Sequence, residues 1–338
     1  MASGQVMELD ASEEKQKNRR SGLHEQQRRW GWIFISPWIV GFTLFTAAPI
    51  LISLYWTFTD YTLGSEDAVN FVGLTNWQRL FTDPLALQAL KVTGTFAAIA
   101  IPIFLLVPLG MAALLNAENL WGKRVWRTLF YLPYMVPAVS GIFVWQAFLN
   151  GQSGWLNRML RFFGIEDFLI WLSDAPFIGN YWNFEGLPNW LQNEQTIATA
   201  FLIMGFWGVG NAMLTMLASM QGVPKELYEA ADVDGAGAWK KFRNITLPMI
   251  SPVIFYNLVL VAIGMMRYFE VPYIVSRGTG APNNAAYFYN IHFYKTAFTA
   301  FDMGYGAAQA WFIFILSMII TLALFATSAR WVFYAGGD

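Results

Sequence analysis

Few side chains in this 338-residue chain have the types and spacing needed for catalysis or metal binding. It has two histidines, His24 and His292, and no cysteine, so no cluster has the spacing of metal ligands. A phosphate-binding GxxxxGK[ST] loop is also missing, because Gly122-Lys123 is followed by Arg124. We therefore expect no catalytic centre, no metal and no cofactor on this chain. Any nucleotide hydrolysis that drives it would belong to another subunit.

The most informative charged residues are Arg267 and Glu270, at the end of a long apolar run. Their spacing of three would place both on one helical face. Ionisable groups at membrane depth usually face a bundle interior or a water-filled path, so the two are candidates for a solute path. A structural ion pair, or an arginine that reaches for the membrane surface, is the alternative. Further polar candidates for contacts with solute hydroxyls are Asn211, Tyr256, Asn257 and Tyr268.

The composition indicates that membrane helices position these groups. Hydrophobic residues make up 56% of the chain and charged residues 13%, against a usual charged share of about 25%. Six stretches approach or exceed the roughly 20 apolar residues of a helical span. We predict an all-α integral membrane protein with six transmembrane helices over residues 30–333, between tails at 1–29 and 334–338. The stretches are 30–58, 92–115, 128–148, 196–220, 251–274 and 307–329.

The basic residues predict the orientation. Fourteen of the 21 Lys and Arg fall in the N-terminal tail, in the loops after the second and fourth stretches, or, in the case of Arg330, just after the sixth stretch. By the positive-inside rule, both termini and these loops lie in the cytoplasm. The net charge of -1 gives no argument for nucleic acid. Prolines in the first three stretches predict kinks rather than breaks: Pro37, Pro49, Pro102, Pro108, Pro133 and Pro137.

Residues 221–250 are predicted to form a polar cytoplasmic loop that contains two short helices. Pro224 suits a first helical turn, and Gly235 is expected to end that helix with a positive φ. A second helix over 236–245 follows, and Leu247-Pro248 is expected to turn the chain back into apolar sequence. Small residues around Gly235 would let a partner approach closely, although a mere surface helix joining two spans is the alternative.

The spacing in this loop carries a family resemblance. Glu229-Ala230-Ala231 is followed by three residues, Gly235, nine residues, Ile245, one residue and Leu247-Pro248. This pattern resembles the EAA loop of permease subunits of binding-protein-dependent ABC importers. Four other motifs are similar to the maltose-type first permease in the sugar and glycerol-phosphate branch of that family, so that the resemblance covers roughly residues 30–330. They are Phe71-Val72-Gly73-Leu74, Asn76-Trp77, Leu132-Pro133, and Thr279-Gly280 before Ala281-Pro282-Asn283-Asn284.

The resemblance implies a type I ABC importer permease fold and a role as half of a translocation path for a carbohydrate. It also implies three kinds of partner: a second EAA permease, two ATPase subunits that bind ATP and Mg, and an extracytoplasmic solute-binding protein. The loop residues expected to couple to the ATPase are Glu229, Ala230, Ala231, Asp234, Gly235, Ile245, Leu247 and Pro248.

Other functions remain open at this point. The solute could be glycerol phosphate or another polar molecule. A secondary transporter driven by an ion gradient would need intramembrane acids, and Glu270 is the only acid in the six stretches. A membrane enzyme would need a catalytic constellation that the sequence does not offer.

The main extracytoplasmic loop, residues 149–195, is rich in tryptophan among acidic residues. One interpretation is a docking surface for the solute-binding protein. The other is a belt of tryptophans at the membrane interface, where this residue is generally enriched. The tryptophans concerned are Trp155, Trp171, Trp182 and Trp190.

Overall fold

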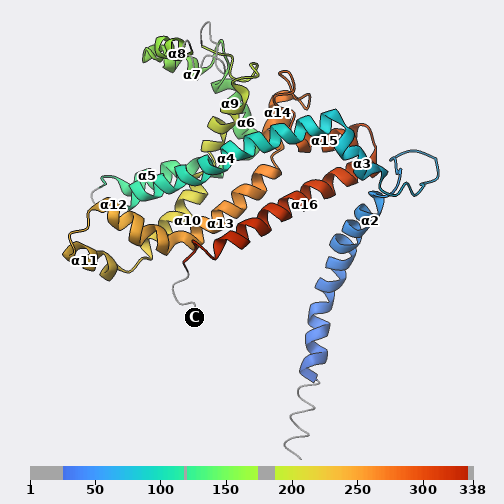
Figure 1. Cartoon of the computed structure of the whole chain (residues 1–338), viewed down its shortest axis with the longest axis horizontal. Coiled ribbons are helices and arrows are strands. Elements are labelled where there is room, and N and C mark those ends of the chain that lie inside the picture. The colour runs from blue at the N-terminus through green and yellow to red at the C-terminus, as the bar shows by residue number, and fades with distance from the viewer. Residues whose placement is uncertain (1–25, 118–119, 174–186, 334–338) are drawn as a thin grey trace, which may run out of the picture.

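The computed structural model describes residues 26–117, 120–173 and 187–333. Its described part is helical, with two isolated β-bridges and no β-strand. Four helices are long and apolar enough to cross a membrane, and two bent helix pairs raise the number of spans to as many as six (Figure 1). The predicted all-α membrane architecture is therefore confirmed. The four long helices are Gln26–Trp56, Pro84–Asn116, Ala238–Ser276 and Met303–Ser328.

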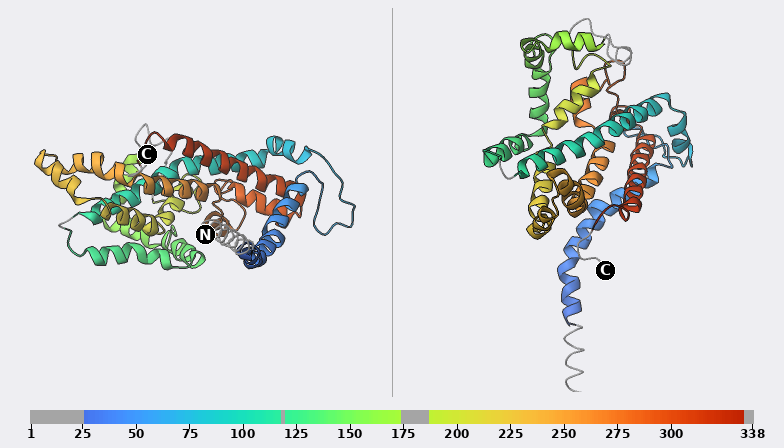
Figure 2. Two further views of the ribbon diagram at one scale, coloured as in Figure 1. Left: turned by 90° about the horizontal axis from the view of Figure 1, so that it is seen from below. Right: turned by 60° about the vertical axis from the view of Figure 1, so that its left-hand side comes forward.

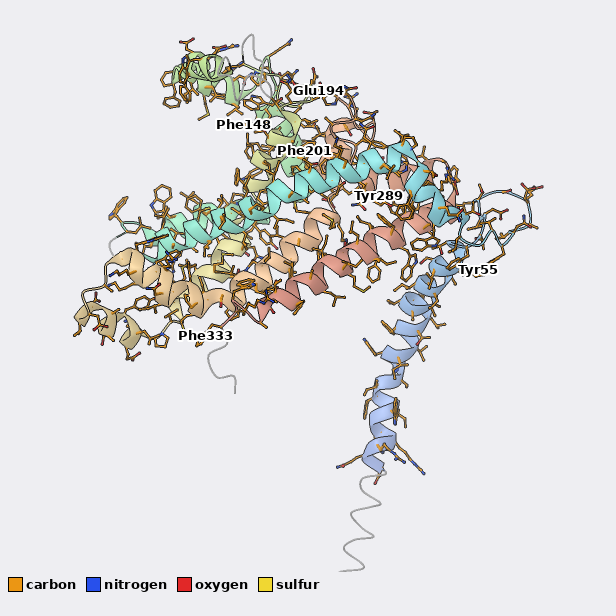
Figure 3. All side chains as sticks on the ribbon, viewed as in Figure 1. Tyr55, Phe148, Glu194, Phe201, Tyr289 and Phe333 are labelled. Carbon is orange, nitrogen blue, oxygen red and sulfur yellow. The ribbon has the colours of Figure 1, made fainter. Side chains whose placement is uncertain are left out.

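The first span stands apart from the rest of the chain. It includes a π-helical turn, η1 (Thr43–Ala47), and ends in α2 (Ala48–Trp56). None of its most apolar window is buried. The helix stands clear of the body in Figure 2, and its side chains project into open space in Figure 3. It touches the body near its end, where Trp311 Nε1 donates to Ser53 Oγ at 3.2 Å. A long apolar surface is left uncovered.

The body is built around α4 (Pro84–Asn116), which packs against α10 (Gly210–Gln221) and α13 (Leu247–Met266). The side chain of Asp83 caps the start of α4 by accepting from the backbone N–H of Leu85 at 2.9 Å. α16 (Met303–Ser328) lies along α13 and is capped in the same way by Asp302. Near the loop at 221–250, buried Met213, Met216 and Ile250 form the centre of one apolar cluster.

Two predicted spans are each divided into two helices. α5 (Lys123–Tyr131) and the short 3₁₀ turn η2 (Leu132–Met135) meet α6 (Ala138–Phe148) at 104°. Val136, which precedes Pro137, takes an extended backbone, as residues before proline tend to do. The expectation of a kink is therefore wrong here, because the chain breaks. α9 (Ile197–Phe206) meets α10 at 49°.

The remaining helices are short and lie at the two ends of the body. α11 and α12 lie at the end where α4 finishes, and α3 and α15 lie where α4 begins (Figure 1). α7 and α8 lie beyond the far end of α6 and α9. The bounds are α3 (Thr75–Thr82), α7 (Trp155–Phe162), α8 (Ile165–Ser173), α11 (Lys225–Val233), α12 (Ala238–Lys241), the π turn η3 (Phe242–Thr246), α14 (Glu270–Ser276), α15 (Tyr289–Tyr294) and the π turn η4 (Lys295–Thr299).

Candidate coupling surface and solute cavities

The turn after α11 has the geometry expected of a helix ended by glycine. Gly235 has a φ of +70°, which confirms the predicted left-handed conformation. The backbone N–H of Ala236 donates to Ala231 O at 2.8 Å, and that of Gly235 donates to Asp232 O at 3.0 Å. This pair of bonds is the Schellman motif, which satisfies carbonyl groups left free at a helix end. The direction that the chain takes after α11 is therefore fixed by backbone hydrogen bonds.

The expectation that the chain turns at Leu247-Pro248 is wrong. α12 begins at Ala238 and runs through η3 into α13 as one helix. Just before Pro248, the N–H of Leu247 bonds to Phe242 O five residues back, and this wider turn makes room for the proline ring. The hydroxyl of Ser251 donates to Pro248 O at 2.6 Å, a carbonyl that Pro252 has no N–H to reach. The predicted second short helix is the start of the fifth span.

Internal contacts hold α11 against this helix. The hydroxyls of Tyr228 and Thr246 lie 2.8 Å apart, and Lys241 Nζ lies 2.7 Å from Asp232 Oδ1. Tyr228 also packs with Phe242 on the apolar cluster around Met216. The surface formed by α11 and its turn is therefore held in a defined position.

The residues expected to couple divide into two groups. Glu229, Ala230, Asp234 and Gly235 are exposed, and Ala231 is half-buried. Beside them, the apolar side chain of Val233 is 90% exposed. A firmly held surface of small and apolar groups has the character of an uncovered interface. In contrast, the half-buried Ile245, Leu247 and Pro248 belong to the continuous helix.

Arg267 and Glu270 do not share a helical face, contrary to the prediction. α13 ends at Met266 and α14 begins at Glu270, because Pro272 supplies no N–H and is accommodated only in a first turn. Within the described ranges, no ion pair joins the two side chains. Both nevertheless line one cavity of about 520 Å³, together with Tyr268 and Asn290. The two residues therefore remain candidates for a solute path because they line one cavity, and not because they share a helical face.

Glu270 also lines a second cavity, of about 290 Å³, whose walls include Tyr134, Trp145, Trp207 and Gly205. The two tryptophan rings meet edge to face with centroids 5.6 Å apart. Trp145 Nε1 is buried and has no hydrogen-bond partner. Sequence reasoning missed both tryptophans, since nothing in an apolar run marks an indole that faces a cavity. The site combines aromatic faces, one free donor and one carboxylate.

Three other path candidates line neither of these cavities. Asn257 is buried, and its amide donates to Val253 O at 2.8 Å and to Thr215 Oγ1 at 3.3 Å, so it joins helices rather than faces a path. Asn211 is exposed at the start of α10. Tyr256 is 56% exposed on α13.

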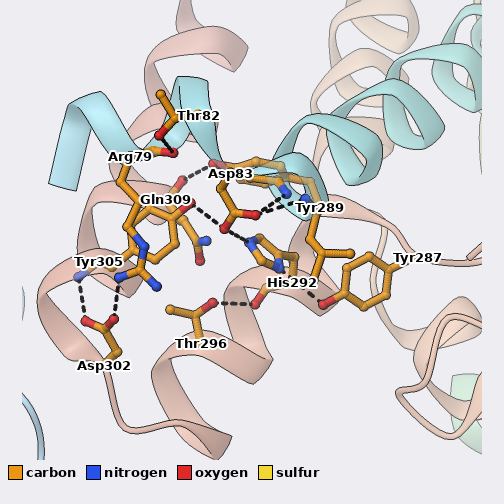
Figure 4. A network of polar contacts seen from close by, with 12 residues as sticks. Arg79, Thr82, Asp83, Tyr287, Tyr289, His292, Thr296, Asp302, Tyr305 and Gln309 are labelled. Atoms are coloured by element: carbon orange, nitrogen blue, oxygen red, sulfur yellow. Dashed lines mark hydrogen bonds and ion pairs between the residues drawn. The ribbon is translucent and has the colours of Figure 1, made fainter.

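A polar network joins the starts of α4 and α16 to α15 (Figure 4). Asp83 accepts from the Tyr305 hydroxyl at 3.0 Å, and its carboxylate lies 3.3 Å from Nε2 of buried His292. On its other side, His292 Nδ1 lies 3.1 Å from the Tyr287 hydroxyl. Arg79 pairs with Asp302 at 2.8 Å and stacks over Tyr305. Sequence analysis missed this network, whose members come from four separate segments.

Burial sets the protonation of this network. It lowers the pKa of His292, and the nearby Asp83 carboxylate opposes that effect without overcoming it. Burial alone would raise the pKa of Asp83, but hydrogen bonds from Tyr305, Ala86 and Leu85, together with His292, lower it overall. At neutral pH the network therefore holds an ionised carboxylate beside a neutral imidazole.

Comparison with known proteins explains the combination of apolar spans and a firmly held loop. Residues 105–334 match the family described as the binding-protein-dependent transport system inner membrane component. The chain belongs to this permease family. It is therefore a multi-pass inner-membrane protein, and the type I permease fold expected from the loop motif is confirmed.

Individual relatives cover nearly the whole permease. A probable ABC transporter permease protein, YesP, of Bacillus subtilis is 35% identical over 90% of this chain and 92% of its own. AmyD of Thermoanaerobacterium thermosulfurigenes, a probable permease for starch degradation products, is 29% identical over 89% and 94%. In a solved bacterial alginate ABC transporter, complexed with a periplasmic protein that holds an alginate pentasaccharide, one chain superposes with a TM-score of 0.71. That match has 20% identity over 90% of the permease and 96% of the other chain.

Proposed function

We propose that this permease forms half of the membrane path of an ATP-driven carbohydrate importer and that the surface around α11 couples it to an ATPase. The observation that carries the proposal is the exposed turn at Gly235, fixed by its own backbone bonds and followed by an unbroken helix. The names of relatives that move starch products support a sugar or oligosaccharide as the solute.

The continuous helix offers a direct mechanical route. A displacement imposed on α11 reaches α12 through the Lys241–Asp232 contact and η3 through the Tyr228–Thr246 contact. From α12 the backbone runs without a turn through α13 to the break at 267–269, next to Glu270 and both cavities. ATP binding and hydrolysis on two partner ATPase subunits, with Mg, would drive this as a rigid-body change between two states.

The chemistry of the smaller cavity, whose walls include Glu270 and no basic residue, favours a sugar over glycerol phosphate. Trp145 and Trp207 provide apolar ring faces, and the free indole N–H of Trp145 can donate to a hydroxyl oxygen. The carboxylate of Glu270 can accept from a hydroxyl but would repel a phosphate. We therefore place the solute beside Glu270, between the two cavities, with Arg267 and Tyr268 on the opposite side from the tryptophans.

The uncovered first span supports a membrane partner. Its side chains expose large apolar groups, including Phe34 at 78% and Phe45 at 83%. Some of this surface can face lipid, and a second permease of the same kind would complete the path. On this proposal both termini and α11 lie in the cytoplasm, and an extracytoplasmic solute-binding protein delivers the sugar.

Uptake by proteoliposomes that contain the permease, its second permease and the ATPase tests the proposal. Solute-binding protein loaded with labelled oligosaccharide is added outside, with ATP and Mg trapped inside. We expect uptake that requires both ATP and the binding protein and that continues when ionophores collapse all ion gradients. Uptake that survives without ATP and stops with the ionophores would instead establish a secondary transporter.

A further inference from the structure

α7 has two apolar faces, of which only one is used inside the molecule. Its inner face places Leu156 and Leu160 against the core cluster that contains Phe96 and Phe201 of the spans. Asn157, on the same side, is buried and fully bonded. It donates to Gly151 O at 2.9 Å and to Pro188 O at 3.2 Å, and it accepts from Trp190 Nε1 at 2.7 Å. These contacts fix the rotation of α7 about its axis.

Trp190 is thereby assigned a structural role. It is 9% exposed and its indole N–H is bonded to Asn157, so it is available neither to a docking protein nor to lipid headgroups. Trp182 lies outside the described residues. The two interpretations of the outer loop therefore rest on Trp155 and Trp171, which are 63% and 66% exposed.

The outer face of α7 carries an uncovered apolar stripe. Trp155, Met159 and Phe162 follow at helical spacing and are 63%, 47% and 84% exposed. On α8, Phe168 stacks on Trp171 at 5.8 Å, and both rings are exposed. Hydrophobic side chains this exposed, in a segment fixed to the protein, indicate an environment other than water.

The position of α7 along the chain indicates its depth. Its inner face joins the apolar cluster that extends into the spans, and α7 packs at the far end of α6 (Figure 1). It follows α6, whose Phe143 and Val144 are 58% and 55% exposed on the apolar surface of a candidate span. A tight turn separates the two helices, with Asn150 Oδ1 accepting from Ser153 N at 2.9 Å. The stripe therefore lies just beyond the end of a helix that also exposes apolar side chains.

The charges beside the stripe suit the boundary between headgroups and acyl chains. The guanidinium of Arg158 lies 5.6 Å from the ring centroid of Trp155. Arg161 is paired with Glu166 at 3.2 Å, which leaves Arg158 as the cation on α7 that is free for a lipid phosphate. An amphipathic helix with aromatic side chains on one face and arginine at its border is typical of segments that lie in a membrane interface.

We propose that α7 lies in the outer membrane–water interface with Trp155, Met159 and Phe162 inserted into the outer leaflet of the bilayer. Phospholipid is thus the occupant of this surface. Anchored in this way, α7 holds the outer end of α6, the helix that carries Trp145. The inference concerns the surface of the permease and holds whichever solute it moves.

Spin labels on single cysteines test this placement, because the chain has no native cysteine. Phe162→Cys and Met159→Cys report on the stripe. Phe143→Cys on the exposed face of α6 is the lipid reference, and Glu66→Cys in an exposed outer loop is the aqueous reference. Each labelled permease is assembled into the complete transporter in lipid nanodiscs. Collision rates with oxygen, which concentrates in lipid, and with a nickel chelate, which stays in water, are then measured.

We expect the labels at 162 and 159 to match the Phe143 reference, with at least a several-fold higher ratio of oxygen to nickel collisions than at Glu66. Adding the solute-binding protein should leave these ratios unchanged. Labels that behave like Glu66 until the binding protein is added, and are then shielded from both reagents, would show a protein-docking surface and overturn the proposal. Labels that stay aqueous throughout would overturn it as well.

Discussion

At the scale of single residues, hydrogen bonding and cavity lining distinguish the candidates for the solute path from side chains that join helices. Trp145 and Trp190 are alike in sequence terms, yet the indole N–H of Trp190 is bonded to Asn157, whereas Trp145 lines a cavity and its buried indole N–H has no hydrogen-bond partner. Asn257 and Glu270 are both polar residues at membrane depth, and only Glu270 lines a cavity. Such distinctions depend on neighbours from other helices, so a single sequence could not predict them.

Replacing Trp145 by Phe should weaken uptake while the protein still folds. The change keeps an aromatic ring and removes the free donor, so a solute would lose one hydrogen bond of about 0.5–1.5 kcal/mol. We expect a several-fold higher KM for uptake at matched membrane levels, and a similar effect for Glu270→Gln. Kinetics equal to those of the parent in both variants would remove this cavity from the solute path.

The network around His292 should make stability depend on pH. Burial lowers the pKa of His292 in the folded chain, so the unfolded chain takes up a proton first as the pH falls below 6.5. The free energy of unfolding should therefore decrease as the pH is lowered below this value. The His292→Gln variant should lose much of this decline, as measured by thermal unfolding across the range. His24→Gln, which changes the only other histidine, is the control, and an unchanged pH dependence in His292→Gln would contradict the assignment.

At the scale of elements, the prolines illustrate what a sequence can and cannot predict. Positions of the apolar stretches were predicted well, because hydrophobic length is a property of the local sequence. Whether the helix continues or breaks at a proline was not predicted correctly. Pro248 and Pro49 each follow a π-helical turn that carries the helix onward, whereas Pro137 follows an extended residue and the chain turns by 104°. At Pro49 and Pro248 the wider turn is closed within the helix itself, by Ala48 N–H to Thr43 O and by Leu247 N–H to Phe242 O.

The junction between α5 and α10 should be sensitive to one methyl group. A Cβ atom on Gly210 would lie 2.3 Å from Phe130 O, so the backbones touch there. Gly210→Ala should force the helices apart, at a cost of about 1–3 kcal/mol in stability. Gly208→Ala is the matched control, because its nearest contact would be an ordinary 3.6 Å. Equal thermal stability of the two purified variants would show that this contact does not constrain the bend.

At the scale of the whole molecule, the loop motif predicted far more than the composition did. Composition led only to a membrane protein with several spans, whereas the spacing from Glu229 to Pro248 led to the family and its fold, both since confirmed. The exposed first span and the shape of the cavities could not be predicted, since they depend on how helices pack. The orientation in the membrane remains a prediction from the basic residues.

Labelling of single cysteines in intact cells tests the orientation. Lys240→Cys, on the exposed start of α12, should be shielded from a thiol reagent that cannot cross the membrane, and Glu66→Cys should react. Permeabilising the cells should make Lys240→Cys react to the same extent, which controls for local burial. Strong labelling of Lys240→Cys from outside would reverse the orientation and place α11 on the wrong side for an ATPase.

The central claim, that the turn after α11 couples the permease to ATP hydrolysis, is tested most directly by Gly235→Val. Valine at a φ of +70° meets strain of about 1–2 kcal/mol, which would reorient α11 without unfolding six spans. Gly237→Val is the matched control, since Gly237 has a φ of -69° and a Cβ atom added at either glycine would meet no atom within 4 Å.

The measurement is the ATPase rate of the reconstituted transporter with and without solute-loaded binding protein, at equal permease content. The account predicts that Gly235→Val loses the stimulation, or fails to retain the ATPase subunits, and that Gly237→Val behaves like the parent. Full stimulation and normal assembly in Gly235→Val would contradict it.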